Sequence, residues 1–134
     1  MGQDRAMKGI GEYLDLHATA LGVRAKRNKV LASNIANAAT PNFKARDINF
    51  EGEIRKAGGD GVMNVTDGRH IRVGLHAPSN SMLYRQPVQP SRDGNTVEMN
   101  VEQMEFSENV IRYQTTLTFL NNKIGGLLSA IKGE

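Results

Sequence analysis

Residues 106–131 read FSENVIRYQTTLTFLNNKIGGLLSAI, and no other stretch says as much about the architecture. Its apolar side chains recur at alternating steps of three and four residues, the 3.5-residue repeat of helices that pack along one another. The positions of this repeat are Phe106, Val110, Tyr113, Leu117, Leu120, Ile124, Leu127 and Ile131. The pattern predicts a long helix that ends near residue 131, with Asn100 capping its start and Gln103 three residues later.

The beginning of the chain carries a rougher version of the same repeat. Its positions are Ile10, Leu14, His17, Leu21, Arg24, Asn28, Leu31, Ile35 and Ala38, of which three interrupt the apolar series. We expect a helix over residues 8 to 38, because Thr40 precedes Pro41 and the residue before a proline is disfavoured in the α region. The apolar members Leu14, Leu21, Leu31 and Ile35 are the candidate packing residues of this helix.

Two helices of about 30 residues would each be about 45 Å long at 1.5 Å per residue. That is out of proportion to a compact domain of 134 residues with 39% apolar and 5% aromatic residues and no tryptophan. The sequence therefore predicts a mainly α fold in which the long N- and C-terminal helices pack as a coiled coil. We expect three segments: an N-terminal helix in residues 1–40, an irregular and partly β middle in residues 41–96, and a C-terminal helix in residues 97–134.

The middle segment holds all four prolines and most of the turn signals. Phe50, Ile54 and Ala57 have the spacing of a short helical turn. Residues 62–66 and 71–75 flank an Asp-Gly pair and predict a short hairpin. Residues 76–92 lack periodicity and predict an extended loop, and residues 93–95 predict a turn.

The sequence lacks the residue patterns of metal binding, nucleotide binding and nucleophilic catalysis. The chain has no cysteine, and its three histidines, His17, His70 and His76, share no metal-ligand spacing. It has no nucleotide-binding glycine loop and no nucleophile motif. We therefore expect no enzymatic activity, no catalytic or metal residues and no cofactor. No apolar run approaches the roughly 20 residues of a membrane span, and the first residues lack the apolar core of a cleavable signal peptide.

The charges leave a second class of function open. With 17 basic and 14 acidic residues the net charge is +3, and Arg24, Lys26, Arg27 and Lys29 cluster in one predicted helix. A soluble basic helical adaptor or a nucleic-acid-binding module is thus an alternative. However, at about 100° per residue these side chains fall on opposite sides of the helix rather than in one stripe. Residues 1–40 are net positive and residues 97–134 net negative, so the two helices are plausible packing partners.

A family resemblance comes from residues 30–45, which read VLASNIANAATPNFKA. This stretch resembles the N-terminal signature of the axial proteins of the bacterial flagellum, which form its rod and hook. The matching residues are Ser33, Asn34, Ile35, Ala36, Asn37, Thr40, Pro41 and Phe43. Asn42 stands where glycine is usual in the family, and asparagine tolerates the left-handed backbone better than most residues, so we expect the turn to be kept.

The second half of the chain is similar to the small proteins of the proximal rod, on residues 93–102, which read DGNTVEMNVE, and on the final helix. The resemblance implies a structural subunit of the basal-body rod, whose terminal helices form the inner layer of a helical tube that transmits torque. Its implied partners are further copies of itself, neighbouring rod proteins, the basal-body ring and rod-base junction protein, and the flagellar type III export apparatus. No nucleic acid or small-molecule substrate is implied. The implied location is the rod in the periplasmic space, reached without a cleavable signal peptide. Another small rod protein of the same family is the nearer alternative.

Overall fold

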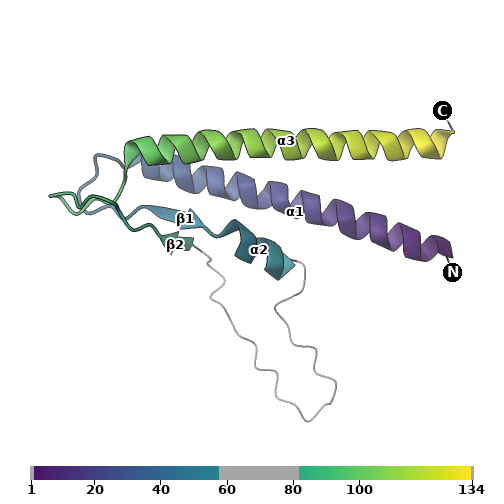
Figure 1. Ribbon diagram of the computed structural model, residues 1–134, viewed down its shortest axis with the longest axis horizontal. Helices are drawn as coiled ribbons and strands as arrows, with labels where there is room; N and C mark the ends of the chain where they lie inside the picture. Colours follow the sequence, from purple (N-terminus) through teal and green to yellow (C-terminus); the bar gives the residue numbers. More distant parts are fainter. Residues whose placement is uncertain (1, 58–81, 134) are drawn as a thin grey trace, which may run out of the picture.

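The computed structural model describes residues 2–57 and 82–133, and these form two long antiparallel helices with a small mixed layer beside one of them. Helix α1 spans Gly2–Ala36 and helix α3 spans Met99–Lys132. They lie side by side over much of their length, so the N- and C-termini are at the same end of the molecule (Figure 1). The predicted mainly α fold with packed terminal helices is confirmed.

The smaller elements lie along α1 from its C-terminal end to its middle, where Ala57 lines a pocket together with Leu16 and Thr19. Strand β1 (Arg46–Ile48) pairs antiparallel with strand β2 (Met82–Tyr84), and helix α2 (Phe50–Ala57) follows β1. The predicted helical turn at Phe50 is confirmed as α2. The predicted hairpin of residues 62–66 and 71–75 lies outside the described residues, as do His70 and His76.

Neither strand was predicted, and the extended loop expected over residues 76–92 was wrong at its centre. Both strands have only three residues, too few to show an alternating pattern, and their partners are almost forty positions apart in the sequence. The expected cap at Asn100 was also wrong. Glu98 is the N-cap residue and makes no side-chain cap, because its carboxylate accepts hydrogen bonds from the backbone N–H groups of Val88 and Gln89.

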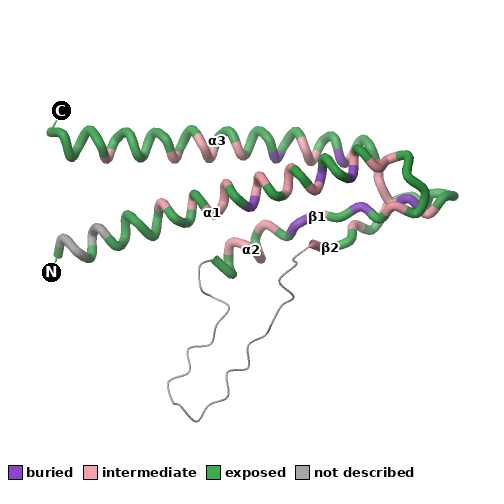
Figure 2. Tube along the Cα trace, turned by 180° about the vertical axis from the view of Figure 1, so that it is seen from behind, coloured by how far each residue is buried: buried purple, intermediate pink, exposed green. Residues whose placement is uncertain are grey.

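The buried residues lie in the half of the molecule where the chain turns between its elements (Figure 2). Among the described residues the buried hydrophobic side chains are Val23, Leu31, Ala45 and Ile48. The buried polar ones are equal in number: Asn34, Asn95, Glu102 and Asn109. Toward the termini both helices are largely exposed (Figure 2). One end of the helix pair is therefore closed by packing, and the other end is open.

A backbone clasp joins the loop after α1 to the turn before α3. The N–H of Asn42 donates to Asp93 O over 2.9 Å, and the N–H of Thr96 donates to Phe43 O over 3.0 Å. Asn42 has a φ of 60° and Gly94 a φ of 74°, so both sides of the clasp use the left-handed region. The expected left-handed turn at Asn42 is confirmed, as is the turn at residues 93–95.

Replacement of Gly94 by alanine tests this clasp. A Cβ atom at Gly94 would lie 2.5 Å from the Asn42 side-chain oxygen, in a backbone conformation that disfavours any side chain. We expect Gly94→Ala to lower the free energy of unfolding by about 1 to 3 kcal/mol, measured by chemical denaturation. Gly125→Ala is the control, because Gly125 lies in α3 with open space around it. That variant should be neutral or stabilising by up to about 1 kcal/mol, and equal losses in the two variants would contradict the account.

Candidate functional site

The family motif places Asn34 at the junction of three elements. Its side chain is buried, with 1% of its surface exposed. The amide nitrogen donates to Arg46 O over 2.6 Å and to Glu102 Oε2 over 3.0 Å, and the amide oxygen accepts from the N–H of Arg46 over 3.1 Å. One asparagine of α1 therefore binds the edge of β1 and a carboxylate of α3. No other residue type of this size offers both a donor and an acceptor in one plane.

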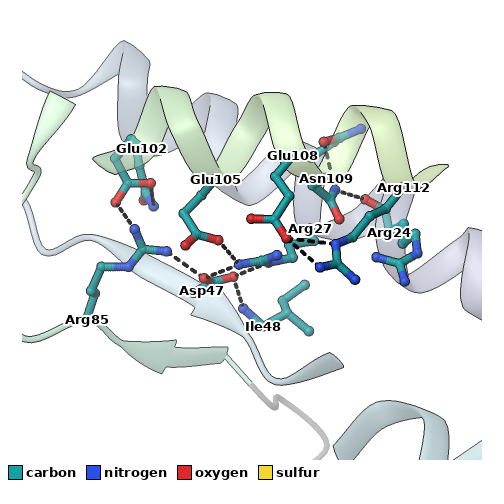
Figure 3. Close-up of polar contacts among 12 residues, drawn as sticks. Arg24, Arg27, Asp47, Ile48, Arg85, Glu102, Glu105, Glu108, Asn109 and Arg112 are labelled. Carbon is teal, nitrogen blue, oxygen red and sulfur yellow. Dashed lines mark hydrogen bonds and ion pairs between the residues drawn. The ribbon is translucent and has the colours of Figure 1, made fainter. Parts of the chain in front are cut away.

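Four charged side chains extend this junction into a network (Figure 3). Arg27 of α1 binds both carboxylate oxygens of Asp47, over 2.8 and 2.9 Å, and Glu105 Oε2 over 2.7 Å. Arg85, just after β2, binds Asp47 Oδ2 over 2.5 Å and Glu102 Oε1 over 2.8 Å. Six residues make up this network, which we call the polar node: Arg27, Asn34, Asp47, Arg85, Glu102 and Glu105.

Every charged side chain of the polar node has an oppositely charged partner, in a set of two guanidinium groups and three carboxylates that is partly buried. Burial acts to raise the pKa of Asp47, but hydrogen bonds from Arg27 and from the N–H of Ile48 outweigh it and hold that pKa below its usual value. The same bond with Asp47, helped by Glu105, raises the pKa of Arg27. Glu102 has none of its surface exposed and is paired with Arg85 and Asn34. Such a network stabilises one arrangement of its elements and penalises others, because an unpaired buried charge is costly.

A second asparagine, Asn95, closes the C-terminal end of α1. Its side-chain nitrogen lies 2.8 to 3.0 Å from the backbone oxygens of Asn37, Ala38 and Thr40. These carbonyls belong to the turn that follows α1, where helical partners run out. Within the motif, Asn37 also accepts a hydrogen bond from the Thr40 hydroxyl over 3.1 Å. The motif thus ends the helix and fixes the direction in which the chain leaves it.

A third asparagine, Asn109, lies in the seam between the two long helices. It has none of its surface exposed, and its side-chain nitrogen donates to Arg24 O and to the Asn28 side chain over 2.9 and 2.8 Å. A buried asparagine in a helix seam specifies the register of the pairing, because a shifted helix would leave it unpaired. The interrupted repeat of the N-terminal helix, with Asn28 on its seam, was the only sequence signal for this contact.

The predicted seam residues divide into two groups. Leu31 is buried, and eight residues are partly buried: Leu14, Leu21, Ile35, Phe106, Tyr113, Leu117, Leu120 and Leu127. Val110, Ile124 and Ile131 are exposed, with 37%, 40% and 82% of their surfaces accessible. Sequence periodicity did not single out Glu102 and Asn109, the two buried residues of α3, because they are polar. The face of α3 toward α1 is thus rotated slightly from the apolar repeat, and part of that repeat faces away.

The free ends of α1 and α3 enclose an open apolar groove. It has a volume of about 390 Å³ and is lined by Gly9, Ile10, Tyr13, Leu14, Lys123 and Leu127. His17 packs between Tyr13 and Phe119, with ring centroids 4.6 and 5.1 Å away. Large apolar side chains remain exposed along this end: Ile10, Tyr13, Leu16, Ile124, Leu128 and Ile131. This surface suits packing against another helix more than binding a polar ligand.

Residues 2–57 and 82–133 contain no group of three or more His, Cys, Asp or Glu side chains that could hold a metal ion. None of the helices in these ranges combines the length and the apolar composition of a membrane-spanning segment.

Comparison with known proteins identifies relatives over nearly the whole chain. Residues 14–44 match the family model described as flagella basal body rod protein. The flagellar basal body rod protein FlgB of Cereibacter sphaeroides is 56% identical over 128 residues, 96% of this chain and 100% of that protein. FlgB of Aeromonas hydrophila is 49% identical, over 89% of this chain and 92% of its own. FlgB of Salmonella typhimurium is 40% identical, over 85% and 88%.

The polar node predicts a dependence of stability on pH. Because the pKa of Asp47 is lower in the folded chain than its unfolded value of about 3.9, its contribution is complete above about pH 4 and is lost as the pH falls through the folded value. Asp47→Asn should lower the free energy of unfolding at pH 7 by about 2 kcal/mol and flatten the loss of stability that the wild type shows as the pH falls below about 4. Thermal unfolding over this pH range measures both.

Glu51→Gln is the matched control, since Glu51 makes an exposed ion pair with Arg55. We expect it to change the unfolding free energy at pH 7 by less than about 0.5 kcal/mol. If Asp47→Asn loses as much stability at acid pH as the wild type does, Asp47 does not hold the junction together.

Proposed function

This chain belongs to the FlgB family of flagellar basal body rod proteins, and we propose that it assembles through the apolar surfaces left open at the free ends of α1 and α3. It is a structural subunit of the proximal rod of the flagellar basal body. The observation that carries the assembly proposal is the open groove between the two free helix ends, together with the exposed apolar residues beside it.

The free energy of burying apolar side chains favours helices of neighbouring subunits as the groups that fill the apolar groove. Ile124 and Leu128 are 40% and 52% exposed on the same flank of α3, and Ile10 is 42% exposed on α1. Each such side chain contributes about 1.5 to 3 kcal/mol when it is fully buried. Within the described residues, the middle segment lies away from the ends of α1 and α3 that carry the termini (Figure 1), so we expect other helices to bury these side chains. Contacts between different surfaces of identical subunits generate an open helical assembly when the rotation between neighbours does not close a ring.

The division of the molecule suggests two layers. We place residues 1–40 and 97–134 in the inner layer of the tube, where long helices pack along one another. We place residues 41–96, with the small sheet and α2, in the outer layer. Torque would then pass through many interlocked helix seams, while the polar node keeps the outer segment fixed on its helix pair. Leu31 is buried within the chain, and the other predicted seam residues keep their proposed role as packing residues between subunits.

We propose that the chain contacts copies of itself, neighbouring rod proteins and the ring and rod-base junction proteins, and that the flagellar type III apparatus exports it without a cleavable signal peptide to the periplasmic rod. Folding of the free helix ends would follow export, since isolated helix segments are marginally stable in water. No catalysis, cofactor or small-molecule substrate is part of this role.

The basic cluster of α1 does not favour the nucleic-acid alternative. Arg27 is held in the polar node by Asp47 and Glu105. Arg24 stacks on Phe50, with its guanidinium carbon 4.2 Å from the ring centroid. Only Lys26 and Lys29 of the four are exposed. Two lysines do not make the continuous basic face that phosphate binding requires.

Charge introduced on the exposed flank of α3 tests the assembly proposal. Ile124→Asp and Leu128→Asp place a carboxylate where the neighbouring helix would pack, but they disturb no buried contact within the chain. We expect each variant to keep the melting temperature of the dilute chain within a few degrees, yet to abolish rod assembly and swimming motility in cells lacking the native protein.

Asn122→Asp supplies the control, because Asn122 is exposed on the opposite side of the same turns of α3. It introduces the same charge and should support swimming. Normal motility of cells carrying Ile124→Asp or Leu128→Asp would contradict the proposal.

A further inference from the structure

Within the described residues, Arg24 of α1 has no ion-pair partner, whereas Arg27 of the same helix has two. It lies between α1, α2 and α3, one turn before Arg27. Arg27 binds Asp47 and Glu105, and Arg85 binds Asp47 and Glu102. Within the part of the chain that the structure describes, the Arg24 side chain makes no hydrogen bond or ion pair, and its Nε is buried without a partner.

The surroundings of Arg24 hold it in place without neutralising it. Its backbone oxygen is fixed by the Asn109 side chain, and its guanidinium is stacked on the Phe50 ring. Burial and the neighbouring charges of Arg112 and Arg27 lower its pKa, and the one opposing charge is Glu108. Glu108 is already bound to Arg112, over 2.6 and 2.8 Å. A half-buried guanidinium beside two like charges would be stabilised by an ion pair with a carboxylate.

The same helix carries the complementary groups. Among the acidic side chains that the structure describes, Glu12 and Asp15 are the two with no hydrogen-bond or ion-pair partner. They are exposed, and their spacing of three residues places both on one face of α1. At 1.5 Å per residue, Glu12 lies about 18 Å and Asp15 about 13.5 Å along the helix from Arg24, beyond the reach of an intramolecular pair.

We propose that Arg24 is a docking point for Glu12 and Asp15 of a second copy of the chain. This inference rests on the proposed function, because it requires subunits that pack along their helices. A neighbour in parallel orientation would be shifted by about 13 to 18 Å along α1, and this shift places its acidic pair opposite Arg24. Such a contact joins two different surfaces and therefore continues from subunit to subunit rather than closing a dimer. The ion pair then specifies the axial shift between neighbouring subunits, while burial of the apolar groove supplies most of the affinity between them.

A charge swap tests the proposal on the full-length chain. Sedimentation velocity over a range of concentrations gives the apparent self-association constant. Arg24→Glu should weaken self-association about tenfold or more, as should the double variant Glu12→Arg, Asp15→Arg. The combination of all three changes should restore association to within a few-fold of the wild type. Lys26→Glu is the control, since Lys26 is exposed on the same helix, and it should have no more than a twofold effect.

Arg24→Gln serves as a second variant if Arg24→Glu disturbs the fold, which circular dichroism of dilute samples reveals. It removes the charge without reversing it and should weaken association by several-fold. This inference is overturned if Ile124→Asp weakens self-association but the Arg24 and Glu12/Asp15 variants do not. The proposed function would still stand in that case. Failure of the triple variant to recover also overturns the pairing. A wild-type chain that stays monomeric at every concentration contradicts the self-assembly part of the proposed function itself.

Discussion

The buried amide of Asn34 is the contact on which the other features depend. It binds both backbone groups of Arg46 and the carboxylate of Glu102, so it fixes β1 and α3 on α1 at once. Glu102 in turn positions Arg85, and Arg85 shares Asp47 with Arg27. Removing the amide would leave a fully buried carboxylate short of one partner, which is far more costly than losing an exposed hydrogen bond.

A polar junction suits a subunit that has little apolar core of its own. Among the described residues there are as many buried polar side chains as buried apolar ones, and they lie in the same half of the molecule. Hydrogen bonds depend on direction, so they specify how the chain turns between its elements, whereas apolar packing alone tolerates sliding. The apolar side chains toward the termini are thereby left available for other helices. Buried polar residues therefore fix the fold of the subunit, and exposed apolar residues are available for contacts between subunits.

The sequence predicted the two long helices, because the C-terminal repeat is apolar at all eight positions and the N-terminal repeat at six of nine, both with the period of packed helices. It also predicted the turn at Asn42 and the importance of the Asn34 motif, the latter by resemblance. It missed β1 and β2, because three-residue strands carry no pattern of their own. It missed Glu102 and Asn109 because a search for apolar seams passes over buried polar residues, whose partners, Arg85, Asn34 and Asn28, come together only in the folded chain.

The most direct test of a closed polar end and an open apolar end is amide hydrogen exchange of the dilute chain, repeated after assembly. The account predicts strong protection at residues 31–35 and 102–109 in the dilute chain, with fast exchange at residues 9–16 and 124–131. On assembly the protection should spread to both free ends. Equal protection along the whole of α1 and α3 in the dilute chain would contradict it, because the free ends would then be stable without a neighbour.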